Sequence, residues 1–185
     1  MKPIGIAALD SFFARVQVIL DRVYTTEDAL VSARNALITA VGVAEGVTLD
    51  VALAEAVKSA QGALQLSLAG GKPTITVKPG TPPQAAAIGN AINGMVAATG
   101  KIATELPKLQ GDAMALVEEA KSIPAKVPSM AADMGASPLQ IPKMLGAVKD
   151  NVGTTLAVPG EIKGLIEEGV NTLNLVKTAF GGAPG

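Results

Sequence analysis

The sequence contains no cysteine, no histidine and no tryptophan. These absences remove disulfide bonds, thiolate nucleophiles and imidazole bases or ligands, on which many catalytic and metal sites depend. Without cysteine, the sequence also gives no indication of an oxidising or reducing compartment. We therefore expect a protein that is not an enzyme, with no catalytic residues, no cofactor and no metal site.

Aromatic and charged residues are also scarce. Aromatics make up 2% of the 185 residues and charged residues 17%, whereas hydrophobic residues make up 49%. The 15 basic and 16 acidic residues nearly cancel, and few aromatic rings are present to stack on bases, so nucleic acid is not an expected partner. The apolar residues are mainly alanine and aliphatic side chains, which favour close contact between helices.

Targeting signals and long apolar runs are not evident. The N-terminal stretch MKPIGIAALDSFF is interrupted by Asp10, and no small-residue cleavage site follows it. No stretch approaches the roughly 18 uninterrupted apolar residues of a membrane-spanning helix. The cytoplasm is the default expectation for such a sequence.

Two pairs of adjacent carboxylates are the nearest approach to a chemical motif. They are Glu118–Glu119 and Glu167–Glu168. Neighbouring residues on a helix diverge by about 100°, so neither pair converges on a substrate. We interpret them as solvated charges.

Apolar residues at alternating steps of three and four predict four helices. We expect helices at residues 5–24, 27–68, 83–123 and 138–180, joined by connectors at 69–82 and 124–137. Similar lengths of the last three helices and short connectors favour antiparallel neighbours. The predicted fold is a single all-α domain over residues 1–185, an elongated up-down bundle of three long helices and a shorter N-terminal one.

Several local signals place the helix ends and interruptions. Thr25 begins a TTED stretch that is typical of a new N-terminus, and Ser137 is an expected N-cap followed by Gln140. Gly46, the 100–107 region and Pro159 lie near the middle of the three long helices. These positions predict a shared bend, with each helix either running straight on or folding back there.

The segment GGKPTITVKPGTPPQ, residues 70–84, differs from its surroundings. It alternates threonine with isoleucine and valine between two Lys-Pro pairs, which at most fits an edge strand. We expect it to join two helices, and we also consider it a candidate interaction tip. The candidate tip residues are Lys72, Thr74, Ile75, Thr76, Val77 and Lys78.

Acidic residues are missing from residues 56–104, which carry lysine as their only charged residue. We call this stretch the acid-free segment. Three interpretations remain open: a protein-binding end that pairs with a partner or a second copy, a membrane-facing end, or simple burial of the segment. In composition and helix length the chain resembles helical bundles that cover apolar surfaces, such as apolipoproteins and granule-coating phasins, and also helical pore-forming proteins.

We therefore expect a non-catalytic structural or interaction protein that acts by self-association or partner docking. The alternative is a protein that binds lipid surfaces or acts on membranes through its amphipathic helices, as the resemblance to coat-like and pore-forming proteins implies.

Overall fold

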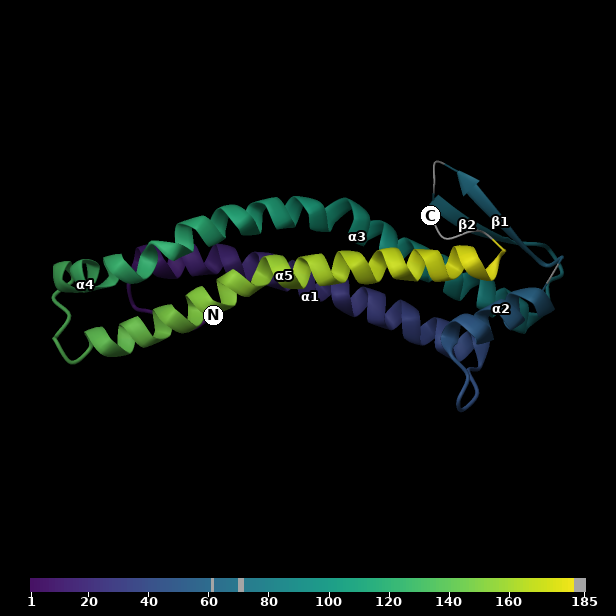
Figure 1. Ribbon diagram of the computed structural model, residues 1–185, viewed down its shortest axis with the longest axis horizontal. Coiled ribbons are helices and arrows are strands. Elements are labelled where there is room, and N and C mark those ends of the chain that lie inside the picture. The colour runs from purple at the N-terminus through teal and green to yellow at the C-terminus, as the bar shows by residue number, and fades with distance from the viewer. Residues whose placement is uncertain (61, 70–71, 182–185) are drawn as a thin grey trace. The chain divides into compact units, whose positions relative to one another are not determined.

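The structure is a computed structural model that describes residues 1–60, 62–69 and 72–181, apart from the side chains of residues 68, 69 and 72. Within these residues the main elements are five helices and one two-stranded sheet (Figure 1), which confirms the all-α class. The elements in chain order are α1 (Ala7–Val41), α2 (Leu49–Ser59), β1 (Leu64–Ala69), β2 (Lys72–Val77), α3 (Pro83–Lys121), α4 (Ile123–Asp133) and α5 (Ile141–Ala179).

The chain divides into two compact units. Unit 1 consists of Met1–Tyr24 and Glu105–Gly164, and unit 2 consists of Thr25–Thr104 and Leu165–Gly185. The long helices α1, α3 and α5 each contribute residues to both units. The elongated up-down arrangement within a single domain stays a prediction.

The predicted break in the first helix at Tyr24 is wrong. Helix α1 is 35 residues long and runs through Thr25 without a break. Val23, Thr26 and Leu30 are all buried at steps of three and four, so the packed face carries on across the TTED stretch and outweighs its capping signal. The helix ends instead at Val41, and the following Gly42 has a positive φ of 69° that suits a C-terminal glycine and donates its N–H to the Ile38 carbonyl at 3.0 Å.

The predicted helix over residues 27–68 is also wrong, because four different pieces occupy that range. They are the end of α1, a loop, the short helix α2 and strand β1. The loop contains Gly46, with a φ of 79°. Thr48 occupies the N-cap position of α2, although its hydroxyl does not cap the helix. That hydroxyl instead bonds the Asp50 carboxylate and is the main cause of a lowered pKa at Asp50.

Strands β1 and β2 form an antiparallel hairpin in place of the expected helix end and connector. Leu64 pairs with Val77, and Leu66 pairs with Ile75. The period-two alternation Leu-Gln-Leu-Ser-Leu in β1 matches the alternation in β2, so the apolar residues of the two strands share one face. The chain then turns through Pro79 and Gly80, where a φ of 79° fits the glycine position of a type II turn.

Helix α3 confirms the clearest periodicity in the sequence. It starts at Pro83 as predicted and ends at Lys121, two residues before the predicted Ile123. The helix is 39 residues long and runs through Pro107 without a break. Buried positions recur along it at steps of three and four, and the hydroxyl of buried Thr99 donates to the Met95 carbonyl at 3.0 Å. The buried positions on the packed face of α3 are Ile88, Ile92, Met95, Thr99, Ile102, Leu106, Leu109, Ala113, Leu116 and Ala120.

The predicted connector at residues 124–137 is wrong over most of its length, because α4 occupies it. Ile123, Val127 and Ala131 recur every four residues and are buried, so this segment has a packed face. Helix α5 begins at Ile141, one turn after the predicted 138. The Ser137 N–H donates to the Gln140 side chain at 2.9 Å, but Ser137 lies four residues before the start of α5, so the predicted N-cap at Ser137 is wrong.

The two interior positions expected to interrupt α3 and α5 do not end those helices. Pro107 lies inside α3 and Pro159 lies inside α5. Neither helix folds back there, whereas Gly46 lies in a loop.

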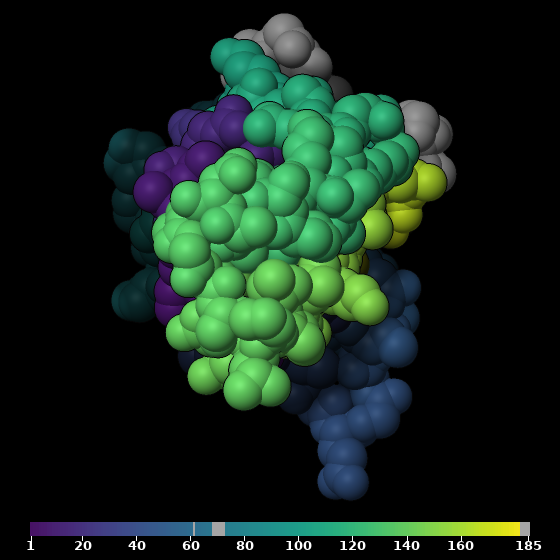
Figure 2. Space-filling model, turned by 90° about the vertical axis from the view of Figure 1, so that its left-hand side faces the viewer, coloured from purple at the N-terminus to yellow at the C-terminus, as the bar shows by residue number. Residues whose placement is uncertain are grey.

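In unit 1 the N-terminal segment is fixed to α5. The Lys2 N–H donates to Asn151 Oδ1 at 2.9 Å, and Asn151 Nδ2 donates to the Lys2 carbonyl at 2.7 Å. Lys2 Nζ also lies 2.6 Å from a carboxylate oxygen of Asp150. Figure 2 shows this purple segment beside the green helices α4 and α5.

Candidate interaction surface

The hairpin packs one face on α3. Leu64 and Ile75 are 8% and 3% exposed, and Pro73 is buried on the same face. The helix offers Gly89 at this contact, where an added Cβ atom would lie 2.6 Å from Val77 Cγ2 and 2.9 Å from Leu64 Cδ2. The absence of a side chain at Gly89 therefore permits the close approach of the hairpin.

Asn93, one turn after Gly89, occupies the edge of β2. The Ile75 N–H donates to Asn93 Oδ1 at 2.8 Å, and Asn93 Nδ2 donates to the Ile75 carbonyl at 2.8 Å. The side-chain amide thus makes both hydrogen bonds that a neighbouring strand would make at this residue. Pro73 has no N–H to offer on the same edge. This edge of β2 is therefore closed to a further strand at both residues.

The predicted tip residues lie in or next to β2, and they do not all face solvent. Thr74 and Thr76 are exposed, as is Lys78 just beyond the strand. Ile75 is buried and Val77 half-buried on the face that meets α3. Lys72 begins the strand, but its side chain lies outside the described residues.

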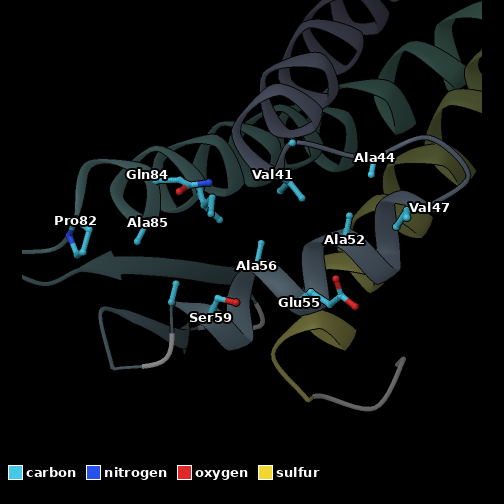
Figure 3. Close-up of a pocket in the computed structure, with 13 residues that line it drawn as sticks. Val41, Ala44, Val47, Ala52, Glu55, Ala56, Ser59, Pro82, Gln84 and Ala85 are labelled. Atoms are coloured by element: carbon cyan, nitrogen blue, oxygen red, sulfur yellow. The ribbon is translucent and has the colours of Figure 1, made fainter.

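A groove of about 470 Å³ lies in unit 2 between the end of α1, helix α2 and the start of α3. Ala52 and Ala56 of α2 and Ala85 of α3 point into it (Figure 3). Small apolar residues predominate, and Glu55 is the one charged residue among them. The residues around it are Val41, Gly42, Ala44, Val47, Ala52, Glu55, Ala56, Ser59, Ala60, Pro82, Gln84, Ala85 and Ile88.

The acid-free segment contributes neutral and cationic groups to the surface. Its described exposed positions include the amides and hydroxyls of Gln65, Ser67 and Gln84. Lys58, Lys78 and Lys101 are exposed as well. Burial accounts for the uncharged residues of its core, but it does not account for the missing acids at exposed positions.

The paired carboxylates make ion pairs with basic side chains. Glu118 lies 2.6 Å from Lys121, and Glu119 lies 3.0 Å from Arg15. Glu168 lies 3.6 Å from Arg34 beside a second hollow of unit 2, of about 340 Å³. These pairs are half exposed, so each contributes at most about 1 kcal/mol to stability.

In the described part of the chain, no three acidic side chains gather in a way that could hold a metal ion. None of the helices in the same residues combines the length and the apolar character needed to cross a membrane.

Comparison with known proteins gives no relative from which to transfer a function. No protein-family model matches the chain, and neither the curated proteins nor the solved structures contain a match.

Gly89, Asn93 and strand β1 are the features of this surface that the sequence analysis missed. Leu64–Leu68 alternates apolar and polar residues, which is a strand signal that the longer helical periodicity obscured. Gly89 and Asn93 stand one turn apart next to the buried residues Ile88 and Ile92. A small residue and an amide at that spacing are a signal for a closely packed neighbour, although they do not identify it.

Proposed function

We propose that this protein is a non-catalytic structural or interaction protein that acts by self-association or partner docking. The contact surface is the part of unit 2 that the hairpin and the groove form. The observation that carries the proposal is the character of the exposed positions in the acid-free segment, which are neutral or lysine and lie next to a groove lined mainly by small apolar residues. Protein interfaces are typically depleted of charge at their centre.

The groove supports a protein partner more directly than a small polar one. Alanines on both of its sides, Ala52 and Ala56 on α2 and Ala85 on α3, leave room for another chain to approach closely. Val47 at its rim and Val51 on the neighbouring helix turn are 36% and 47% exposed. Apolar side chains gathered beside a hollow favour an interaction site over an ordinary solvated face.

A lipid surface is the second candidate. The exposed cations Lys58, Lys78 and Lys101, with no acid in the same segment, would suit anionic headgroups. The amphipathic character of the helices is typical of proteins that lie on membranes. The protein partner is favoured because the apolar face of the hairpin already packs on α3 and is therefore not exposed to a lipid surface.

One pair of variants tests the groove. Ala85→Glu places a carboxylate at a half-buried position of the groove, whereas Ala87→Glu places the same charge on an exposed position of the same helix turn. Light scattering of the full chain between about 1 and 100 µM measures self-association. We expect a discrete oligomer that Ala85→Glu weakens and Ala87→Glu leaves intact.

Vesicle flotation separates the two candidates. The same three proteins are floated with neutral vesicles and with vesicles that contain anionic lipid. An oligomer that stays with the unbound fraction supports the proposal. A monomer that floats with anionic vesicles contradicts it and supports the lipid alternative, and equal effects of the two substitutions show that the groove is not the contact.

A further inference from the structure

We propose that the outer edge of β1 pairs with β1 of a second copy of this chain, so that two hairpins form one antiparallel sheet. The inference rests on the proposed function, because it names the second copy as the partner in self-association. It places the centre of self-association on a backbone edge of the hairpin, which is the other part of that contact surface.

The hydrogen bonds of β2 show which groups of β1 face outward. Since the N–H and C=O of Ile75 both bind Asn93, they point away from β1. Leu66 is paired with Ile75, so this is a non-hydrogen-bonded pair and the N–H and C=O of Leu66 also point away from the hairpin. Among the described residues, no hydrogen bond reaches these two groups of Leu66. Figures 1 and 3 both show β2 between α3 and β1, with β1 on the outer side.

The two edges of the hairpin differ in their protection. Proline, flanking lysines or a covering group normally prevent unwanted pairing at an edge strand. Strand β2 begins with Lys72 and contains Pro73, Lys78 follows it directly, and its edge is covered by Asn93. Strand β1, with the sequence LQLSLA, contains neither proline nor charge. An edge left open beside a closed one is the arrangement expected when only the open edge is used.

The sequence of β1 fits its own copy. Antiparallel pairing centred on Leu66 lets the two Leu66 residues exchange backbone hydrogen bonds and places Gln65 opposite Ser67 of the second copy. A two-fold contact brings the same surface of both copies together, so a charged residue in it would meet like charge. Strand β1 has no charged residue and therefore avoids this repulsion. Gln65 and Ser67 are both exposed, so they are free to form the cross-strand contact.

The closed edge of β2 also limits the assembly. If both edges were open, each added copy would offer a new edge and the sheet could grow without end. Because Asn93 and Pro73 close β2, pairing through β1 uses the open edge of both copies. The expected product is therefore a dimer.

Paired lysine substitutions on the exposed face test the contact. Gln65→Lys with Ser67→Lys puts opposing lysines into the proposed contact. The matched control is Thr74→Lys with Thr76→Lys, which adds the same charge to the same face on the inner strand. In sedimentation velocity we expect a wild-type dimer, an increase in dissociation constant of about tenfold or more for the β1 variant, and little change for the β2 control.

Cross-linking tests the register, since the natural chain has no cysteine. Directly opposite residues have Cβ atoms about 4.5–5.5 Å apart. A mixture of the Gln65→Cys and Ser67→Cys proteins should therefore form disulfide-linked dimers faster than either protein alone.

The outcomes separate this inference from the proposed function. If Gln65→Lys with Ser67→Lys leaves the dimer unchanged but Ala85→Glu weakens it, the inference is overturned and the proposed function stands. A chain that stays monomeric overturns both self-association and the inference.

Discussion

Replacing Gly89 by alanine should loosen the hairpin from α3. The new Cβ atom would lie 2.6 Å from Val77 Cγ2, well inside the optimal carbon–carbon separation of about 3.5–4.0 Å. Leu64 Cδ2, at 2.9 Å, is the end of a flexible side chain and can move aside. Valine is branched at Cβ and stiff at χ1, so the contact with Val77 is the one that the structure cannot easily relieve.

The loss of stability in Gly89→Ala is best measured against the same substitution at a second glycine of the same helix, Gly94. A Cβ atom at Gly94 would meet nothing within 4 Å. Both Gly→Ala changes gain about 0.8–1 kcal/mol of helix propensity, and overpacking at Gly89 costs about 1–3 kcal/mol. The propensity term cancels between the two variants, so Gly89→Ala should be less stable than Gly94→Ala by about 1–3 kcal/mol.

Amide hydrogen exchange of residues 64–69 and 72–77 is the most direct assay, because the hairpin can separate before the rest of unit 2 unfolds. We expect faster exchange in Gly89→Ala than in Gly94→Ala, with urea unfolding as the second measurement. Adding Val77→Ala to Gly89→Ala removes the clashing methyl groups and should restore part of the protection. Equal exchange in the two glycine variants would refute the proposed packing.

Two further substitutions test the interior of unit 2 and the start of α2. Gly169→Ala should be less stable than Gly94→Ala by about 1–3 kcal/mol in urea unfolding, because its Cβ atom would lie 2.9 Å from Ile102 Cγ2 whereas a Cβ atom at Gly94 meets nothing; equal midpoints of the two variants would contradict that contact. Thr48→Ala should raise the pKa of Asp50 toward its ordinary value, measured by NMR titration, because the Thr48 hydroxyl is the main cause of the lowering. A carboxyl group whose pKa is lowered by folding stabilises the folded protein above its unfolded pKa, and this stabilisation is lost as pH falls through the folded pKa. The stabilisation from Asp50 should therefore be smaller in the variant. An unchanged Asp50 titration would contradict the assigned hydrogen bond.

The all-α class and the course of α3 could be predicted from the sequence because they depend on long, regular patterns. The 4-3 spacing from Ile88 to Ala120 is confirmed as buried, and it outweighs the proline within it. The same reasoning failed at Thr25, where a local capping signal competes with packing that only the folded chain provides. Helix α4 was missed because we expected residues 124–137 to form a connector. Pro124 stands in the first turn of α4, where proline loses no hydrogen bond, and Pro128 lies inside the helix.

The candidate surface was less predictable, because it depends on which segments meet. Thr74–Val77 could be recognised as strand-like, but a hairpin needs the second strand, and its residues continue a helical pattern. The distances between Gly89 and the hairpin follow from the tertiary contact alone. The acid-free segment was the one property of this surface that could be read directly from the sequence.

Asn93 in unit 2 and Asn151 in unit 1 hold an extended segment in the same way. Each side-chain amide hydrogen-bonds both the N–H and the C=O of one residue in that segment. An aspartate of the same shape can accept from the N–H, but it repels the carbonyl unless it is protonated. Asn93→Asp should therefore release the hairpin at neutral pH, and hairpin protection in hydrogen exchange should return as pH falls below the ordinary aspartate pKa of about 3.9.

Asn151→Asp provides a second test within the same chain. There the ammonium group of Lys2 pairs with the Asp150 carboxylate at 2.6 Å, so the two neighbouring charges of opposite sign offset each other. The N-terminal segment of Asn151→Asp should therefore also be released at neutral pH and regain its protection in the same acid range as the hairpin of Asn93→Asp. If the hairpin of Asn93→Asp stays protected at neutral pH, the amide is not what holds it on α3.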